Sequence, residues 1–116
     1  MNIGVIFAGG VGKRMNSRVK PKQFIDVYGK PIIIHTLELF ENHPDIDAIV
    51  VSCVKDWIPY FKELLVKYNI RKVREVVEGG ATGQDSIYNG LCAAERVADG
   101  EDAIVLIHDG VRPLIR

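Results

Sequence analysis

Stretches of apolar residues alternate with amphipathic stretches along the whole chain. Apolar runs rich in β-branched residues predict four main strands, at residues 3–7, 47–54, 73–77 and 103–107. Apolar residues also recur at helical spacing in three stretches, which predicts helices starting near residue 31, over residues 57–68 and over residues 87–97. A short strand is expected at residues 26–28, ended by a turn at Gly29 and Lys30.

This alternation predicts an α/β fold. Strands that alternate with helices imply right-handed crossovers and a mainly parallel sheet between helices, and residues 1–116 are expected to form one domain. Ligands of such sheets bind at the carboxyl ends of the strands. Segments rich in glycine and polar residues follow three of the predicted strands, at residues 8–22, 79–86 and 108–113. We expect these segments to converge on one edge of the sheet.

The composition excludes several classes of protein. With 47% hydrophobic and 26% charged residues, the chain is typical of a soluble globule and unlike a disordered or collagen-like segment. No apolar run approaches the roughly 18 residues of a membrane span, and we see no secretion signal, so we expect a cytoplasmic protein with no membrane partner. The 15 basic and 15 acidic residues balance, which gives no support to a nucleic-acid partner. Cys53 and Cys92 are interpreted as small apolar residues, not as a disulfide or a metal pair.

The segment after the first strand combines glycines with cations. Three glycines at residues 9–12 expose backbone amides, and Lys13 and Arg14 follow at once. Amides beside two cations form a cradle for a polyphosphate. Met15 stands where a dinucleotide fingerprint needs glycine, and Phe7 stands where a P-loop needs it, so neither motif fits. A plain strand-to-helix turn is the alternative, although it leaves the cations unexplained.

Two further segments could meet the same phosphate chain. Pro21 stiffens the approach to Lys22, which could add another cation, although a solvated surface lysine is the common alternative. The glycine-containing segment 80–86 leads into a helix, with Asp85 or Ser86 as the predicted N-cap. The Ser86 hydroxyl therefore has two open interpretations, a ligand contact or a helix cap.

The fourth strand runs directly into His108 and Asp109. A carboxylate at the end of a strand can hold Mg²⁺ together with phosphate oxygens, which makes Asp109 a candidate metal ligand. The alternative is a structural pair between Asp109 and Arg112 in the turn. We interpret His108 as a hydrogen-bonded histidine at the strand end and not as a proton-transfer group. The other two histidines show no spacing typical of a zinc site.

Taken together, these motifs resemble one enzyme family, the cytidylyltransferases that act on 2-C-methyl-erythritol 4-phosphate and on ribitol 5-phosphate. The resemblance spans the chain and rests on an ordered set: the glycine segment ending in Arg14-Met15, then Pro21-Lys22-Gln23-Phe24, Gly29-Lys30-Pro31-Ile32, Gly79-Gly80 with Ser86, Asn89-Gly90-Leu91, and His108-Asp109-Gly110-Val111-Arg112-Pro113. It implies a three-layer, Rossmann-like nucleotidyltransferase fold.

The resemblance also implies a reaction and a site. CMP would pass from CTP to a polyol phosphate with the help of Mg²⁺, giving a CDP-polyol and pyrophosphate. Arg14 and Lys22 would be the catalytic residues, and Asp109 would contact the ribose and the metal. The nucleotide would be bound by a larger set: Phe7, Ala8, Gly9, Gly10, Gly12, Lys13, Gly80, Ala81, Thr82, Ser86 and Asp109. The full-length enzymes of this family would form homodimers.

Two departures from the family pattern leave alternatives open. Gly83 stands where the family often has arginine, so recognition of the base would rest on main-chain groups. The family's members are about twice as long, so these residues resemble the nucleotide-binding half, truncated after about half of the usual domain. A CTP-binding fragment without turnover, and a nucleotidyltransferase that uses another NTP and a sugar phosphate, are the alternatives. The segment Lys55-Asp56-Trp57-Ile58 resembles the ribitol-phosphate members, although it also fits a capped helix with a core tryptophan.

Overall fold

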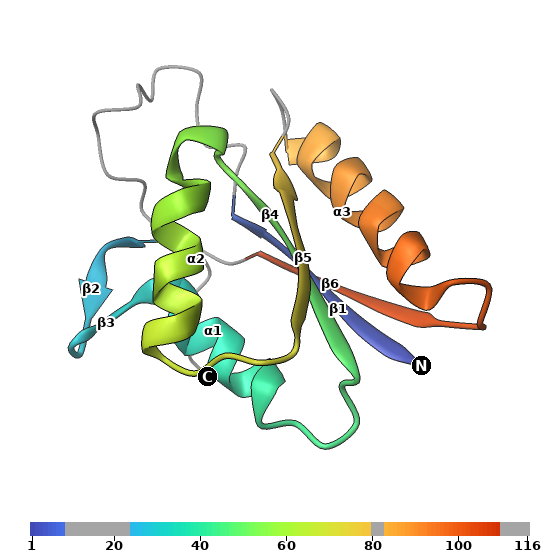
Figure 1. Cartoon of the computed structure of the whole chain (residues 1–116), viewed down its shortest axis with the longest axis horizontal. Helices are drawn as coiled ribbons and strands as arrows, with labels where there is room; N and C mark the ends of the chain where they lie inside the picture. The colour runs from blue at the N-terminus through green and yellow to red at the C-terminus, as the bar shows by residue number, and fades with distance from the viewer. Residues whose placement is uncertain (9–23, 80–82, 110–116) are drawn as a thin grey trace.

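The computed structural model describes residues 1–8, 24–79 and 83–109, with the backbone alone at residues 8, 83 and 109. Its main strands are β1 (Asn2–Ala8), β4 (Ala48–Cys53), β5 (Val73–Glu78) and β6 (Ile104–Asp109). They form one parallel sheet in the order β5-β4-β1-β6 (Figure 1). The predicted strands and their parallel arrangement are confirmed.

Three α-helices cover the two faces of this sheet within the described residues. α1 (Ile32–Glu41) and α2 (Ile58–Lys67) pack on one face, and α3 (Gly83–Ala98) packs on the other (Figure 1). Alternate residues of β4 explain this arrangement: Ile49, Val51 and Cys53 join the core under α1 and α2, whereas Ala48 and Val50 join the core under α3. The predicted three-layer α/β architecture is confirmed. No helix among the described residues has the length and apolar character needed to cross a bilayer.

The region expected to hold one short strand contains a hairpin instead. β2 (Asp26–Val27) pairs antiparallel with β3 (Lys30–Pro31), and the turn places Tyr28 and Gly29 at positive φ, 54° and 83°. Glycine adopts this conformation at no steric cost, which explains why the turn falls at Gly29. Lys30 ties the hairpin to α1 through an ion pair of 2.6 Å with Glu38.

The expected caps of two helices are wrong in detail. A 3₁₀ turn, η2 (Lys55–Trp57), precedes α2, so the N-cap position belongs to Trp57 and Asp56 does not cap the helix. α3 begins at Gly83, which places Asp85 and Ser86 inside its first turn and not at its N-cap. α3 starts four residues before its apolar pattern at residue 87, and α2 starts one residue after its pattern at residue 57. The pattern marks the buried face of a helix and not its first hydrogen-bonded residue.

Candidate functional site

The carboxyl ends of the strands lie level with one another. In the sheet register, Ala8 is opposite Cys53, Cys53 is opposite Glu78, and Phe7 is opposite Asp109. The three candidate segments therefore leave the sheet from one edge, as expected. The strand order reverses between β1 and β6, and this is where α/β sheets bind ligands. Phe7 and Asp109 face each other at that switch point, so the first and last candidate segments start side by side.

The structure describes four of the predicted site residues. Phe7 is partly buried near the end of β1, Ala8 ends β1, Asp109 ends β6, and Ser86 is fully buried in α3. The other predicted residues lie outside the described residues: Gly9, Gly10, Gly12, Lys13, Arg14, Lys22, Gly80, Ala81 and Thr82. The structure shows the edge of the sheet from which the segments that carry these residues leave. The roles of the residues themselves stay predictions.

The start of α3 is fixed to the sheet by contacts that the sequence analysis missed. The hydroxyl of Ser52, fully buried one residue before the end of β4, donates a hydrogen bond of 2.7 Å to the carbonyl oxygen of Ser86. Gly90 makes this approach possible, since a Cβ there would lie 3.2 Å from Ser52 Oγ and 2.6 Å from Val5 Cγ1. In the sequence, the only local signal of this close approach is Gly90, the small residue four positions after Ser86.

A second pair of hydrogen bonds fixes the end of β5. The Asn89 side chain donates to the carbonyl oxygen of Glu78 over 2.9 Å, and the Gly79 amide donates to the carbonyl oxygen of Cys53 over 2.7 Å. The residues on both sides of segment 80–82 are therefore held against the carboxyl edge. Such anchoring is what a backbone-lined ligand site requires.

His108 does not show the hydrogen bond that we expected. Its ring packs edge-on against Phe40, with 5.7 Å between centroids, and its Nδ1 atom is buried without a hydrogen-bond partner among the described residues. The interpretation of His108 as a hydrogen-bonded histidine is therefore not supported within that part of the chain.

Asp109 is the residue that we predict to bind the metal ion. Within residues 1–8, 24–79 and 83–109, no group of three or more His, Cys, Asp and Glu side chains could hold a metal ion. The backbone of Asp109 lies at the switch point, where a carboxylate could bind Mg²⁺ jointly with phosphate oxygens of a bound nucleotide. This chemistry needs one protein carboxylate and the substrate itself, so it does not depend on a preformed cluster.

Both cysteines carry free thiols, as expected. Cys53 is buried at the end of β4, and Cys92 lies half-buried on α3. Burial raises the pKa of the Cys53 thiol from 9.0 to about 12, and a hydrogen bond with the Val54 backbone opposes this only in part. Cys53 therefore behaves as a small apolar core residue.

The raised pKa of Cys53 predicts a loss of stability at alkaline pH. Above pH 9 the thiol ionises in the unfolded chain but not in the folded one, so the free energy of unfolding falls between pH 9 and 12. The loss reaches about 1.4 kcal/mol at pH 10 relative to pH 7. Urea denaturation at both pH values should show this loss in the parent chain and in Cys92→Ala. Cys53→Ala should lack it, and an unchanged pH dependence in that variant would contradict the assignment.

Comparisons with known proteins match nearly the whole chain to one enzyme family. Residues 3–116 match the family model described as IspD, 2-C-methyl-D-erythritol 4-phosphate cytidylyltransferase. The chain is 63% identical over 115 residues to a ribitol-5-phosphate cytidylyltransferase of Streptococcus agalactiae, covering 99% of this chain and 48% of the relative. It is 44% identical over 114 residues to a 2-C-methyl-D-erythritol 4-phosphate cytidylyltransferase of Clostridium botulinum, covering 98% of this chain and 48% of that relative.

A solved structure agrees with the fold. The 4-diphosphocytidyl-2C-methyl-D-erythritol synthase of Anaerococcus prevotii superimposes with a TM-score of 0.74 at 31% identity, covering 97% of this chain and 44% of that one. The chain thus spans about half the length of the curated relatives it matches. The expectation that these residues correspond to about half of the usual family length is confirmed.

Proposed function

Because the chain belongs to the 2-C-methyl-D-erythritol 4-phosphate cytidylyltransferase family, we propose that it is the nucleotide-binding half of a CTP-dependent nucleotidyltransferase. The single observation that carries the proposal is the family match over residues 3–116, which includes every candidate segment. The level strand ends at the switch point support it, since all three segments leave from that edge. CTP, Mg²⁺ and a polyol phosphate are the proposed ligands, in a homodimeric enzyme of the cytoplasm, where CTP is available.

Ribitol 5-phosphate is the polyol phosphate that we propose as the acceptor. The relative named for this substrate is 63% identical to the chain, compared with 44% for the relative named for 2-C-methyl-D-erythritol 4-phosphate. The segment Lys55-Asp56-Trp57-Ile58, which resembles the ribitol-phosphate members, points the same way.

The proposed reaction is a substitution at the α-phosphorus of CTP. A phosphate oxygen of the acceptor forms a bond to this phosphorus, the bond to the bridging oxygen breaks, and pyrophosphate leaves with the electron pair. Negative charge grows on the α-oxygens and on the leaving group, and Arg14 and Lys22 would stabilise it. Bound Mg²⁺ would neutralise phosphate charge, with Asp109 as its protein ligand.

The remaining site residues would bind the nucleoside. One side of the cytidine would be lined by Phe7, Ala8, Gly9 and Gly10. The phosphates would lie beside Gly12 and Lys13. Gly80, Ala81 and Thr82 would contact the base through main-chain groups. Ser86 is fully buried in the first turn of α3, and its carbonyl oxygen accepts the hydrogen bond from Ser52. We propose that Ser86 also helps to bind the nucleotide.

The test begins with CTP binding to the 116-residue chain by calorimetry in the presence of Mg²⁺. Binding of CTP in preference to UTP, GTP and ATP is expected, and preference for another nucleotide would favour the alternative nucleotidyltransferase. Pyrophosphate release is then measured with ribitol 5-phosphate and with 2-C-methyl-D-erythritol 4-phosphate. Binding without release would make the chain a CTP-binding half without turnover.

A chimera separates the remaining outcomes. In it, residues 1–116 replace the matched half of the Streptococcus agalactiae relative, and we expect pyrophosphate release with ribitol 5-phosphate. A folded chimera that releases none with either acceptor would overturn the proposed function. Release with only the methylerythritol substrate would overturn the proposed acceptor.

A further inference from the structure

Phe24 is held in a cluster of aromatic side chains, which we call the aromatic anchor: Phe24, Trp57, Tyr60 and Phe61. Phe24 is fully buried and stacks on Trp57 with 5.6 Å between ring centroids. Tyr60 meets it edge-on at 5.3 Å, and Phe61 lies at 6.2 Å. Contacts of this kind add to the stability gained by burial, so the position of Phe24 is strongly determined.

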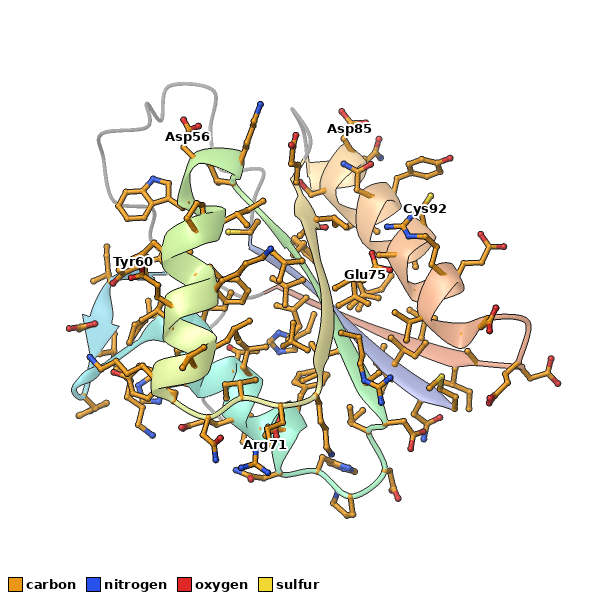
Figure 2. The ribbon with its side chains drawn as sticks, in the orientation of Figure 1. Asp56, Tyr60, Arg71, Glu75, Asp85 and Cys92 are labelled. Atoms are coloured by element: carbon orange, nitrogen blue, oxygen red, sulfur yellow. The ribbon has the colours of Figure 1, made fainter. Side chains whose placement is uncertain are left out.

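The partners of Phe24 come from the chain that directly follows β4. The Trp57 amide donates to the carbonyl oxygen of Val54, which closes η2 at the end of the strand. Figure 1 shows α2 starting beside this end of β4, and Figure 2 shows Tyr60 on the side of α2 turned toward β2. The aromatic anchor therefore joins Phe24 to the carboxyl side of the sheet, where the candidate segments leave.

Phe24 is also restrained from its other side. The Ile32 amide donates to the carbonyl oxygen of Ile25 over 3.0 Å, and the hairpin that follows is tied to α1 by the pair between Lys30 and Glu38. The chain is thus fixed immediately after Phe24 as well as at its ring.

Trp57 and Tyr60 contribute differently from the other apolar residues of α2. Phe61 and Leu64 are buried between the helix and the sheet, whereas Trp57 and Tyr60 are only partly buried and meet each other edge-on at 5.4 Å. Both rings pack on Phe24. Their position serves the segment before the hairpin more than the helix–sheet core.

Phe24 follows Lys22, the proposed catalytic cation, by two residues. Two peptide units reach at most about 7 Å between Cα atoms, so a fixed Phe24 limits where Lys22 can lie. We propose that Trp57 and Tyr60 are positioning residues that act on Lys22 through Phe24. This inference rests on the proposed function, because it assigns the aromatic anchor to the transition-state cation of that reaction. Electrostatic stabilisation requires such preorganisation.

The first test replaces Trp57 in the active chimera. Trp57→Leu is expected to lower kcat about tenfold or more while the KM for CTP changes little, since misplaced catalytic groups act on turnover. Trp57→Phe should retain most of the activity because it keeps a ring against Phe24. Tyr68→Leu is the matched control: it removes a partly buried ring at the other end of α2 and should leave kcat unchanged.

The decisive comparison repeats Trp57→Leu in a Lys22→Ala background. If Trp57 acts through Lys22, the second substitution should have almost no further effect on kcat. Equal fold-losses in both backgrounds would overturn the inference, because a general structural defect acts regardless of residue 22. A chimera inactive before any substitution would instead count against the proposed function, so the two failures are distinguishable.

A measurement independent of activity uses the fluorescence of Trp57, the only tryptophan of the 116-residue chain. Phe24→Leu removes the stacked ring and should shift the emission to longer wavelength, whereas Tyr68→Leu should not. This fluorescence measurement can still be made if Trp57→Leu fails to fold. An emission spectrum unaffected by Phe24→Leu would contradict the packing on which the inference depends.

Discussion

Replacing Arg14 or Lys22 by alanine is expected to lower the turnover of the chimera by about 100-fold or more. The negative charge that these cations would stabilise appears only as the α-phosphorus is attacked and pyrophosphate departs. Their loss should therefore reduce kcat much more than it raises the KM for CTP. Initial rates of pyrophosphate release at varied CTP, with saturating ribitol 5-phosphate, separate the two constants.

Two exposed cations provide matched controls for these substitutions. Arg71 lies just before β5, at the amino edge of the sheet, and hydrogen-bonds to Asn69 over 3.1 Å (Figure 2). Lys67 ends α2 and lies over the ring of Tyr68. Alanine at either position removes the same charge far from the proposed site and should leave the rate near normal. Near-normal rates in Arg14→Ala and Lys22→Ala as well would remove both residues from the mechanism.

Gly90→Ala is expected to lower the free energy of unfolding by about 2 kcal/mol. A Cβ at this position would lie 2.6 Å from Val5 Cγ1, in the fully buried centre of β1, so α3 must move away from the sheet. This cost outweighs the gain of roughly 1 kcal/mol that alanine normally brings inside a helix. Urea denaturation of the 116-residue chain at pH 7 measures the difference.

A double-mutant cycle with Val5→Ala identifies the cause. Val5→Ala removes the Cγ1 atom that the new Cβ would meet, so Gly90→Ala should cost at least about 1 kcal/mol less in that background. An equal cost in both backgrounds would mean that the contact between α3 and β1 is not what requires glycine. A stabilising Gly90→Ala would show that α3 can shift without loss of packing.

Periodicity was sufficient to predict the layers of this fold, because each strand and helix buries a face that its own sequence marks. The start of α3 was not predictable in this way. The bond from Ser52 to the Ser86 carbonyl joins residues from different elements, and the small residue Gly90 is its only local signal in the sequence. Asp85 and Ser86 have the residue types of N-caps but lie within the first turn, since tertiary contacts decide where the helix begins.

For the candidate site, sequence motifs and structure contribute different parts. The motifs predict the chemistry proposed for Arg14, Lys22 and Asp109, and the strand register shows the common edge from which their segments leave. The burial of Phe24 was not anticipated, although Phe24 lies two residues after Lys22 in the Pro21-Lys22-Gln23-Phe24 motif. Its meaning depends on Trp57 and Tyr60, which an isolated motif does not reveal.

The central place of β1 has a consequence for synthesis on the ribosome. β1 is the first of the described strands to be made, yet one of its two neighbours, β6, is the last of them. Until then, the β6 side of β1 is unpaired, because Asn2 pairs with Ile104 and Phe7 pairs with Asp109. Pairing between such distant residues is slow, and open strand edges associate readily. The β6 side of β1 is therefore open to misassembly until residues 104–109 have left the exit tunnel.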